Sequence, residues 1–211
     1  MQKLILILSL FIFTAHHGIS QDETKPLGSF EFGFNSTALL SNLLPFDSNI
    51  SQNANDNLLF FKIGNGKSYF RTAVNVNSES LEEENAKFFN SFALLKIGFE
   101  NKSRLSKSWV FHSGFEAFGS YRAASTESND SFQGNFNNKE VTTGIGGAGI
   151  YGIQWMINNR IALGTEGYLR FSFSETVSET TTFTGNSNDQ KSKSTEFNLD
   201  LPRSILLSFY F

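Results

Sequence analysis

The segment from Glu196 to Phe211 alternates between apolar and polar side chains, and this alternation constrains the fold most. The odd-numbered positions form one parity, meaning a set of alternate residues that share one face of a strand. This parity holds the apolar residues Phe197, Leu199, Leu201, Ile205, Leu207, Phe209 and Phe211. The other parity is mainly polar and holds Glu196, Asn198, Asp200, Ser204, Ser208 and Tyr210. A period of two residues is that of a β-strand whose two faces meet different environments. Pro202 also predicts a bulge or local break in this strand, because proline cannot donate a ladder hydrogen bond.

The same alternation recurs along the chain and predicts seven earlier strands. They cover residues 28–39, 58–63, 68–77, 88–100, 108–122, 140–157 and 160–177. The connections between strands alternate in length. Long polar loops are predicted at 42–57, 78–87, 123–139 and 178–195, and short turns at 64–67, 101–107 and 158–159. The pattern therefore predicts eight antiparallel strands with the short turns at one end and the long loops at the other.

The start of the chain and its composition narrow the class of protein. Residues 1–20 combine Lys3, an apolar run and small residues before Gln21, which predicts a secretory signal. Residues 21–27 form a short polar lead, and 28–211 form a single domain. The mature part has no apolar stretch of about 20 residues, so a transmembrane helix is not expected. The chain has no Cys and a net charge of -3, which argues against disulfides, thiol chemistry and nucleic-acid binding.

These strands, the asymmetry of the connections and the aromatic residue at position 211 resemble the small eight-stranded outer-membrane proteins of the OmpX, OmpA and OmpW type. The resemblance implies an all-β, antiparallel, up-and-down transmembrane β-barrel in the bacterial cell outer membrane. It also implies outer-membrane lipids as neighbours and an insertion signal, Leu207, Phe209 and Phe211, that the barrel-insertion machinery reads. The implied role is structural, adhesive or surface recognition of an extracellular ligand or protein through the loops. It involves no enzyme activity and no cofactor, and small-solute transport or binding as in OmpW is the alternative.

A secreted β-sandwich or lipocalin-like barrel has alternating strands too, and it is the competing architecture. Such a protein would turn its large apolar parity inward and its polar parity toward water. The Phe-rich parity of the predicted strands is too bulky to fill an eight-stranded interior, and the polar parity is rich in Gly but poor in Lys. The direction in which the Phe-rich parity points therefore separates the two architectures.

The inward parity of the expected barrel carries charged residues of both signs. An interior formed by eight strands is wide enough only for side chains, so opposite charges should pair and plug it. The predicted network contains Glu31, Lys62, Arg71, Lys96, His112, Glu116, Glu166 and Arg170, and Glu100 and Arg122 share their parity. A proton or small-solute path through the same charges is the functional alternative.

Candidate chemistry is sparse in this sequence. Gly144 to Gly149 matches G-x-G-x-x-G, but the segment lies inside a predicted strand and lacks the helix that a dinucleotide site needs. His112 is the one histidine after the signal. A barrel enzyme that modifies lipid A would need a serine within reach of this imidazole, and no spacing predicts one. One histidine with scattered carboxylates is also a poor transition-metal site, so neither catalytic residues nor metal ligands are expected.

Overall fold

The structure is a computed structural model that describes residues 27–36, 58–83, 85–130, 134–181, 187–202 and 204–211. The predicted signal, most of the lead and the loop predicted at 42–57 lie outside the described residues. The strands are β1 Phe30–Asn35, β2 Leu59–Gly64, β3 Ser68–Glu83, β4 Ala86–Arg104, β5 Trp109–Asp130, β6 Gly134–Met156, β7 Ile161–Thr181, β8 Ser187–Asp200 and β9 Leu206–Tyr210. No helix that is long and apolar enough to cross a membrane occurs among the described residues.

The strands form one antiparallel up-and-down sheet that closes on itself. Each strand from β1 to β7 pairs with the next one along the chain, and β9 pairs with both β7 and β1. Following the residues paired in register from Phe34 of β1 through β2, β3, β4, β5 and β6 leads to Phe173 of β7. Following them in the other direction around the ring, through β9, leads instead to Leu163 of β7. The ring therefore carries a stagger of ten residues, which requires its strands to tilt.

The final strand differs from the prediction because it is interrupted. β8 ends at Asp200 and β9 begins at Leu206, and both pair with the same edge of β7. The interruption contains Pro202, as the missing backbone donor of proline predicts. The structure thus has nine strands where the sequence pattern predicts eight.

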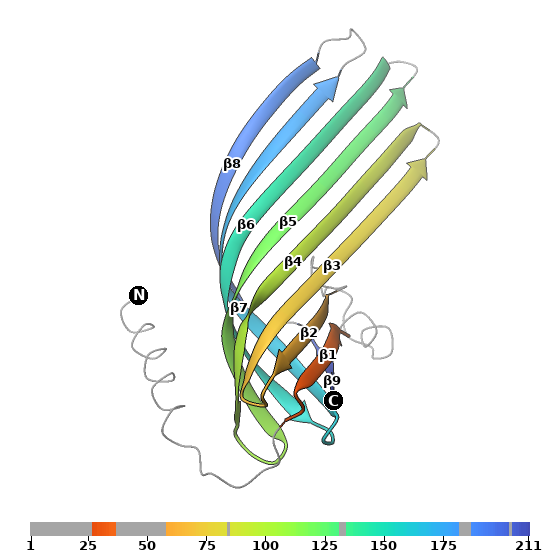
Figure 1. Ribbon diagram of the computed structural model, residues 1–211. Helices are drawn as coiled ribbons and strands as arrows, with labels where there is room; N and C mark the ends of the chain where they lie inside the picture. The colour runs from red at the N-terminus through yellow and green to blue at the C-terminus, as the bar shows by residue number, and fades with distance from the viewer. Residues whose placement is uncertain (1–26, 37–57, 84, 131–133, 182–186, 203) are drawn as a thin grey trace.

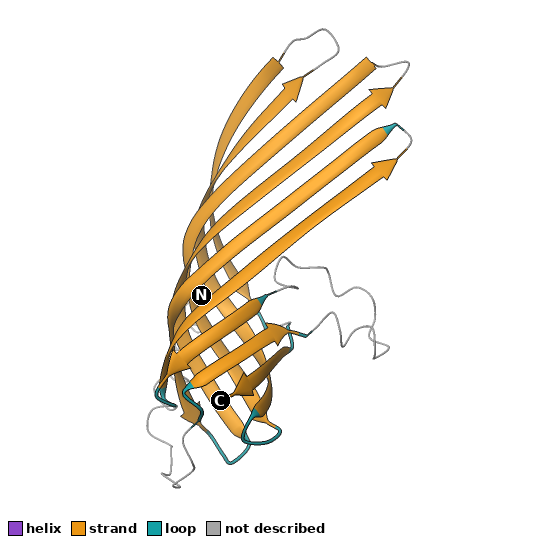
Figure 2. Ribbon diagram, turned by 45° about the vertical axis from the view of Figure 1, so that its right-hand side comes forward, coloured by secondary structure: helices purple, strands orange, loops and turns teal. Residues whose placement is uncertain are grey.

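Three segments predicted as long loops are mostly strand. Residues 78–83, 123–130 and 187–195 continue the ladders of β3, β5 and β8, and their partners in β4, β6 and β7 continue as well. These segments are mainly polar on both faces, with Leu81 as an exception, so they show no sustained apolar alternation although their backbone is extended. Six strands, β3 to β8, consequently rise beyond the ring as an open, curved sheet, whereas β1, β2 and β9 are short (Figures 1 and 2).

Short turns connect β2 to β3, β4 to β5 and β6 to β7 at the other end of the molecule (Figure 2). In each turn a side-chain oxygen accepts hydrogen bonds from two backbone N–H groups, and these oxygens belong to Asn65, Ser106 and Asn158. Gly66 adopts a φ of 86° in the first turn, a left-handed conformation that glycine tolerates best. The turns are therefore short and locally ordered.

The two faces of the ring have the opposite polarity to a water-soluble β-protein. Large apolar side chains point outward, and Phe115, Ile145 and Leu95 are 64%, 67% and 58% exposed. Charged side chains point inward, and Glu31, Lys62 and Arg71 are each 0% exposed. A secreted sandwich or lipocalin-like barrel would show the reverse arrangement. The Phe-rich parity thus points away from the interior.

Apolar residues lie on both sides of the buried charges inside the ring. Along β3 the inward residues are Tyr69, Arg71 and Ala73 in this order, so the charge lies between two hydrophobic clusters. The cluster near the turns contains Leu27, Tyr69, Val110, Met156, Ala162 and Tyr210. The clusters toward the open sheet contain Leu58, Phe60, Ala73 and Leu206, and Ala148, Ile150 and Tyr168. The charges are therefore separated from solvent at both ends.

Candidate functional site

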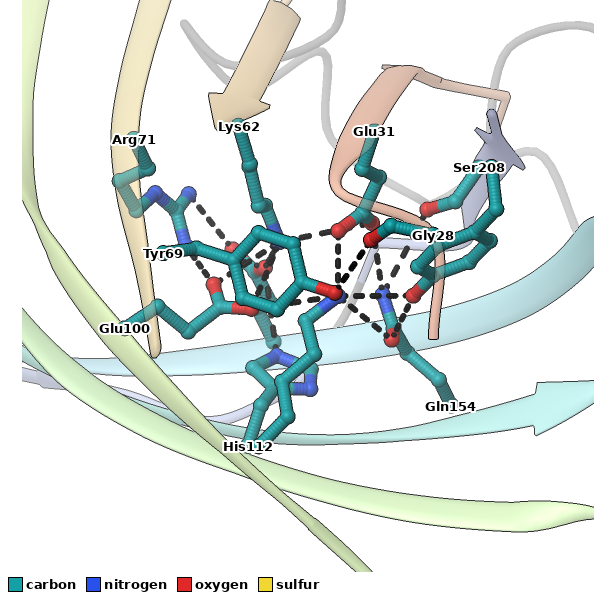
Figure 3. A network of polar contacts seen from close by, with 12 residues as sticks. Gly28, Glu31, Lys62, Tyr69, Arg71, Glu100, His112, Gln154 and Ser208 are labelled. Atoms are coloured by element: carbon teal, nitrogen blue, oxygen red, sulfur yellow. Dashed lines mark hydrogen bonds and ion pairs between the residues drawn. The ribbon is translucent and has the colours of Figure 1, made fainter. Parts of the chain in front are cut away.

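The candidate site is a buried charge network in the middle of the ring. It consists of Glu31 on β1, Lys62 on β2, Arg71 on β3, Lys96, Glu100 and Lys102 on β4, His112 and Glu116 on β5, and Glu166 on β7, each at most 6% exposed. Because side chains of a strand alternate between its faces, each of these strands directs every second residue into the ring. Figure 3 shows Glu31, Lys62, Arg71, Glu100 and His112 converging from strands that are far apart in the sequence.

Lys102 organises the part of the network nearest the turns. Its ammonium group contacts Glu31 closely, donates to the Tyr210 hydroxyl at 2.7 Å and lies 3.4 Å from Gln154 Oε1. Gln154 Nε2 donates to Glu31 Oε1 at 3.1 Å, and the Tyr210 hydroxyl donates to Gln154 Oε1 at 2.7 Å. The Lys102 ammonium also lies 4.6 Å and 4.7 Å from the ring centroids of Tyr69 and Tyr210. The ammonium group of this β4 residue thus contacts side chains from four other strands, β1, β3, β6 and β9.

Lys62 and Glu100 connect this region to the rest of the network. Lys62 Nζ donates to both carboxylate oxygens of Glu100, at 3.0 Å and 2.8 Å. The same ammonium group lies 3.6 Å from Glu31 Oε1 and 3.6 Å from Glu166 Oε1. Lys62 therefore lies among three carboxylates that come from three different strands.

Arg71 binds the carboxylates on the side facing the open sheet. It donates two parallel hydrogen bonds to Glu166, at 3.1 Å and 3.0 Å, and a further one to Glu100 at 3.0 Å. Its Nε lies 3.4 Å from Glu116 Oε2, and Lys96 Nζ lies 2.9 Å from the other oxygen of Glu116. A planar guanidinium suits such multiple recognition of carboxylates.

The formal charges of the network balance. Glu31, Glu100, Glu116 and Glu166 supply four negative charges, and Lys62, Arg71, Lys96 and Lys102 supply four positive charges when His112 is neutral. An unpaired charge at such a position costs several kcal/mol, so the network depends on every member. The arrangement fills and cross-links the interior of the ring.

His112 lies within the network but takes no part in its hydrogen bonds. Its Nε2 is 3.2 Å from Glu166 Oε1, but neither ring nitrogen has a hydrogen-bond partner among the described residues. Gly152 of β6 faces His112 in register, and a Cβ at Gly152 would collide with the imidazole. The close packing of His112 against glycine and carboxylate, with no serine hydroxyl bonded to it in the described part of the chain, does not resemble a nucleophile and its base.

Glu100, His112 and Glu166 place three potential metal ligands within 4.8 Å of one another. Both carboxylates already bind cationic side chains, because Lys62 Nζ is 2.8 Å from Glu100 and Arg71 Nη2 is 3.0 Å from Glu166. A divalent ion would have to displace these cations and would add two positive charges to a balanced network. The donor set therefore fits an ion-pair network better than a metal centre.

Seven of the eight residues predicted for the network lie in it, and Arg170 does not. Arg170 points into the open sheet, where its Nη2 lies 3.2 Å from Asp200 Oδ2 and its guanidinium lies over Phe118 and Tyr168. Arg122 is exposed and donates to Asn90 Oδ1. Lys102 is a member that the pattern missed, because the polar segment 101–107 predicts a turn although β4 continues to Arg104. Lys102 is two residues after Glu100, so continuing the face of Lys96 and Glu100 beyond the predicted end of the strand would have identified it.

The segment expected to be read by the insertion machinery lies at the junction of the ring. Leu207 and Phe209 belong to β9 and face Phe34 and Phe32 of β1 in register. Phe211 follows β9, is 72% exposed and has its ring 6.0 Å from that of Phe30. The glycine-rich segment 144–149 lies within β6, as the sequence predicts, with Phe118 packed where a Cβ of Gly146 would be.

Comparisons with known proteins add little to this geometry. No protein-family model matches the sequence, and no curated protein shows a significant match. Among solved structures, the ferric yersiniabactin uptake receptor FyuA from Yersinia pestis is similar over 67% of this chain, with a TM-score of 0.41 and 12% identity. The chain spans 23% of the length of that receptor. A similarity of this size carries no argument about function.

Proposed function

We propose that this chain is an integral β-barrel protein of the bacterial outer membrane. In this proposal β8 and β9 together occupy one interrupted position, so the ring is an eight-position barrel. The observation that carries the proposal is the inverted polarity of the ring, whose outer face is apolar while charges are paired inside. A closed ring also satisfies the backbone hydrogen bonds that hydrocarbon cannot satisfy. Leu207, Phe209 and Phe211 are the proposed insertion signal for the barrel-assembly machinery.

The barrel acts as an anchor whose interior is closed. The charge network fills the cross-section, and apolar clusters lie on both sides of it. We therefore expect no stable openings when the purified, refolded protein is added to planar lipid bilayers and its conductance is recorded. Reproducible nanosiemens-scale openings at low voltage would contradict the closed interior and favour the small-solute channel.

The open sheet formed by β3 to β8 is the proposed working part. Its hairpins extend beyond the ring on the side opposite the short turns (Figure 1). In the proposed orientation, with the short turns in the periplasm, these hairpins lie outside the cell. Loops and hairpins on a rigid scaffold are the usual place for recognition. The proposed role is thus surface recognition or adhesion, without catalysis and without a cofactor.

Hairpin trimming tests this role. The register allows residues 79–90, 125–139 and 177–191 to be replaced by Asn-Gly turns, because Ser78 faces Ser91, Ala124 faces Glu140 and Thr176 faces Ser192. We expect surface ligands captured from outer-membrane or host-cell extracts by the full-length protein to be lost from the trimmed one. Three variants with one trimmed hairpin each serve as matched controls. Equal capture by the fully trimmed barrel would contradict a role of the hairpins.

A further inference from the structure

A second charged feature lies at the opposite end of the ring from the open sheet. The three short turns and the last residue of β4 carry four basic residues outside the buried network, Lys67, Arg104, Lys107 and Arg160, here called the basic rim. The turn segments 64–68, 101–109 and 157–161 contain no Asp or Glu. Lys67, Lys107 and Arg160 are exposed and Arg104 is half-buried. This end of the ring is therefore a positively charged surface.

The basic rim differs from most of the other basic residues because it has no acidic partner. Within the described residues, no carboxylate lies within ion-pair distance of its four side chains. By contrast, Lys62, Arg71, Lys96 and Lys102 are paired inside the ring. On the open sheet Lys87 is paired with Glu82, Arg170 with Asp200, and Lys191 with Glu175. The charge of the rim is therefore available to an external anion.

The rim borders the apolar outer face directly. Trp109 and Trp155 face each other in register beside the turns and are each 44% exposed. Ile63, Leu105 and Ile157 lie in or next to the same turns and are 63%, 55% and 49% exposed. Tryptophan prefers the headgroup region of a bilayer, and exposed aliphatic side chains prefer the adjoining acyl chains. Any anion bound at the rim would thus lie at headgroup depth.

We infer that the basic rim binds the phosphates of anionic phospholipids in the leaflet that surrounds the short turns. The inference rests on the proposed membrane location and adds the lipid class that this end of the barrel selects. The complementarity is between four unpaired cations on ordered turns and lipid headgroups with a net negative charge. A Lys or Arg near an anionic membrane surface contributes about 1 kcal/mol, which corresponds to about fivefold in affinity. A zwitterionic headgroup offers no such net attraction.

The positions of the tryptophans provide a local readout. Trp109 and Trp155 are the two Trp residues of the chain, and both lie at the rim. The protein is reconstituted in phosphatidylcholine bilayers that contain a brominated lipid, either phosphatidylglycerol or phosphatidylcholine. The bromine atoms lie near the headgroup end of the acyl chains, and the two brominated lipids are used at equal mole fraction. At low ionic strength we expect the brominated phosphatidylglycerol to compete for contact with these tryptophans about fivefold more strongly than the brominated phosphatidylcholine. The preference should decrease as salt is added.

Two charge-matched variants isolate the rim. The variant K67Q/R104Q/K107Q/R160Q should lose the preference, whereas K87Q/K139Q/K191Q/K193Q removes the same charge from the open sheet and should retain it. If the quadruple rim variant does not refold, K107Q/R160Q provides the same comparison on exposed side chains. A preference that survives in the rim variants, or that both quadruple variants lose equally, would overturn the inference. Loss of the preference on adding inorganic phosphate, but not on adding chloride of equal ionic strength, would also overturn the inference, because the site would then take free phosphate.

The same experiment separates the two proposals. Quenching by neither brominated lipid would place the tryptophans outside a bilayer and would contradict the membrane location itself. Equal quenching by both lipids would leave the membrane location intact and overturn only the selection of anionic lipid.

Discussion

Arg71→Met is expected to lower the free energy of unfolding in lipid bilayers by about 3–5 kcal/mol. Arg71 is fully buried and is bonded to Glu100 and Glu166, and its Nε lies 3.4 Å from Glu116. Removing the guanidinium leaves a net negative charge among carboxylates that water does not reach. Methionine is similar in length but cannot replace any of these bonds, so most of the cost comes from the uncompensated charge.

Urea-induced unfolding in vesicles, followed by tryptophan fluorescence, measures this loss. The matched control is Arg170→Met, because Arg170 and Asp200 are partly exposed and their pair should contribute at most about 1 kcal/mol. The double variant R71M/E166Q restores the balance of formal charges and should recover about half of the loss. Equal destabilisation by R71M and R170M would show that the buried charges do not act as a network.

The side-chain alternation predicted most of the residues that face inward along the ring, but it missed Lys102. A strand places successive side chains on opposite faces whatever surrounds it, so Glu31, Lys62, Arg71 and Glu166 could be assigned to one face from their parity alone. The partners could not be assigned, because they depend on the register between strands. The stagger of ten residues, for example, brings Lys102 of β4 beside Tyr210 of β9, and no local pattern contains this information.

The lengths of the strands could not be predicted in the same way. The parity signal exists only where the two faces of a strand meet different environments, as along the ring. Beyond it, the hairpins of β5 with β6 and of β7 with β8 are polar on both faces, so the alternation disappears while the ladder of hydrogen bonds continues. The prediction of loops at 123–139 and 178–195 was wrong for this reason. The break at Pro202 was predictable because it follows from the chemistry of one residue.

Ile97→Arg is expected to destabilise the folded protein in bilayers by about 2–4 kcal/mol. Ile97 lies on the outward face of β4, is 50% exposed and has the outward Thr72 and Ala117 as its neighbours in register. In hydrocarbon, a guanidinium at this position must be desolvated or must deform the bilayer to reach the headgroups. In water the same substitution would add a charge to an already exposed position and would cost little.

The control for this substitution is Ser80→Arg, which adds the same side chain to the outward parity of β3 but on the open sheet. Its effect should remain within about 0.5 kcal/mol, as for ordinary surface substitutions. Unfolding of both variants by urea in the same vesicles gives the comparison directly. Equal effects of I97R and S80R would mean that the apolar face is not surrounded by hydrocarbon. The paired interior charges would then need another explanation, because a ring in water has no reason to expose Ile97 while burying Arg71.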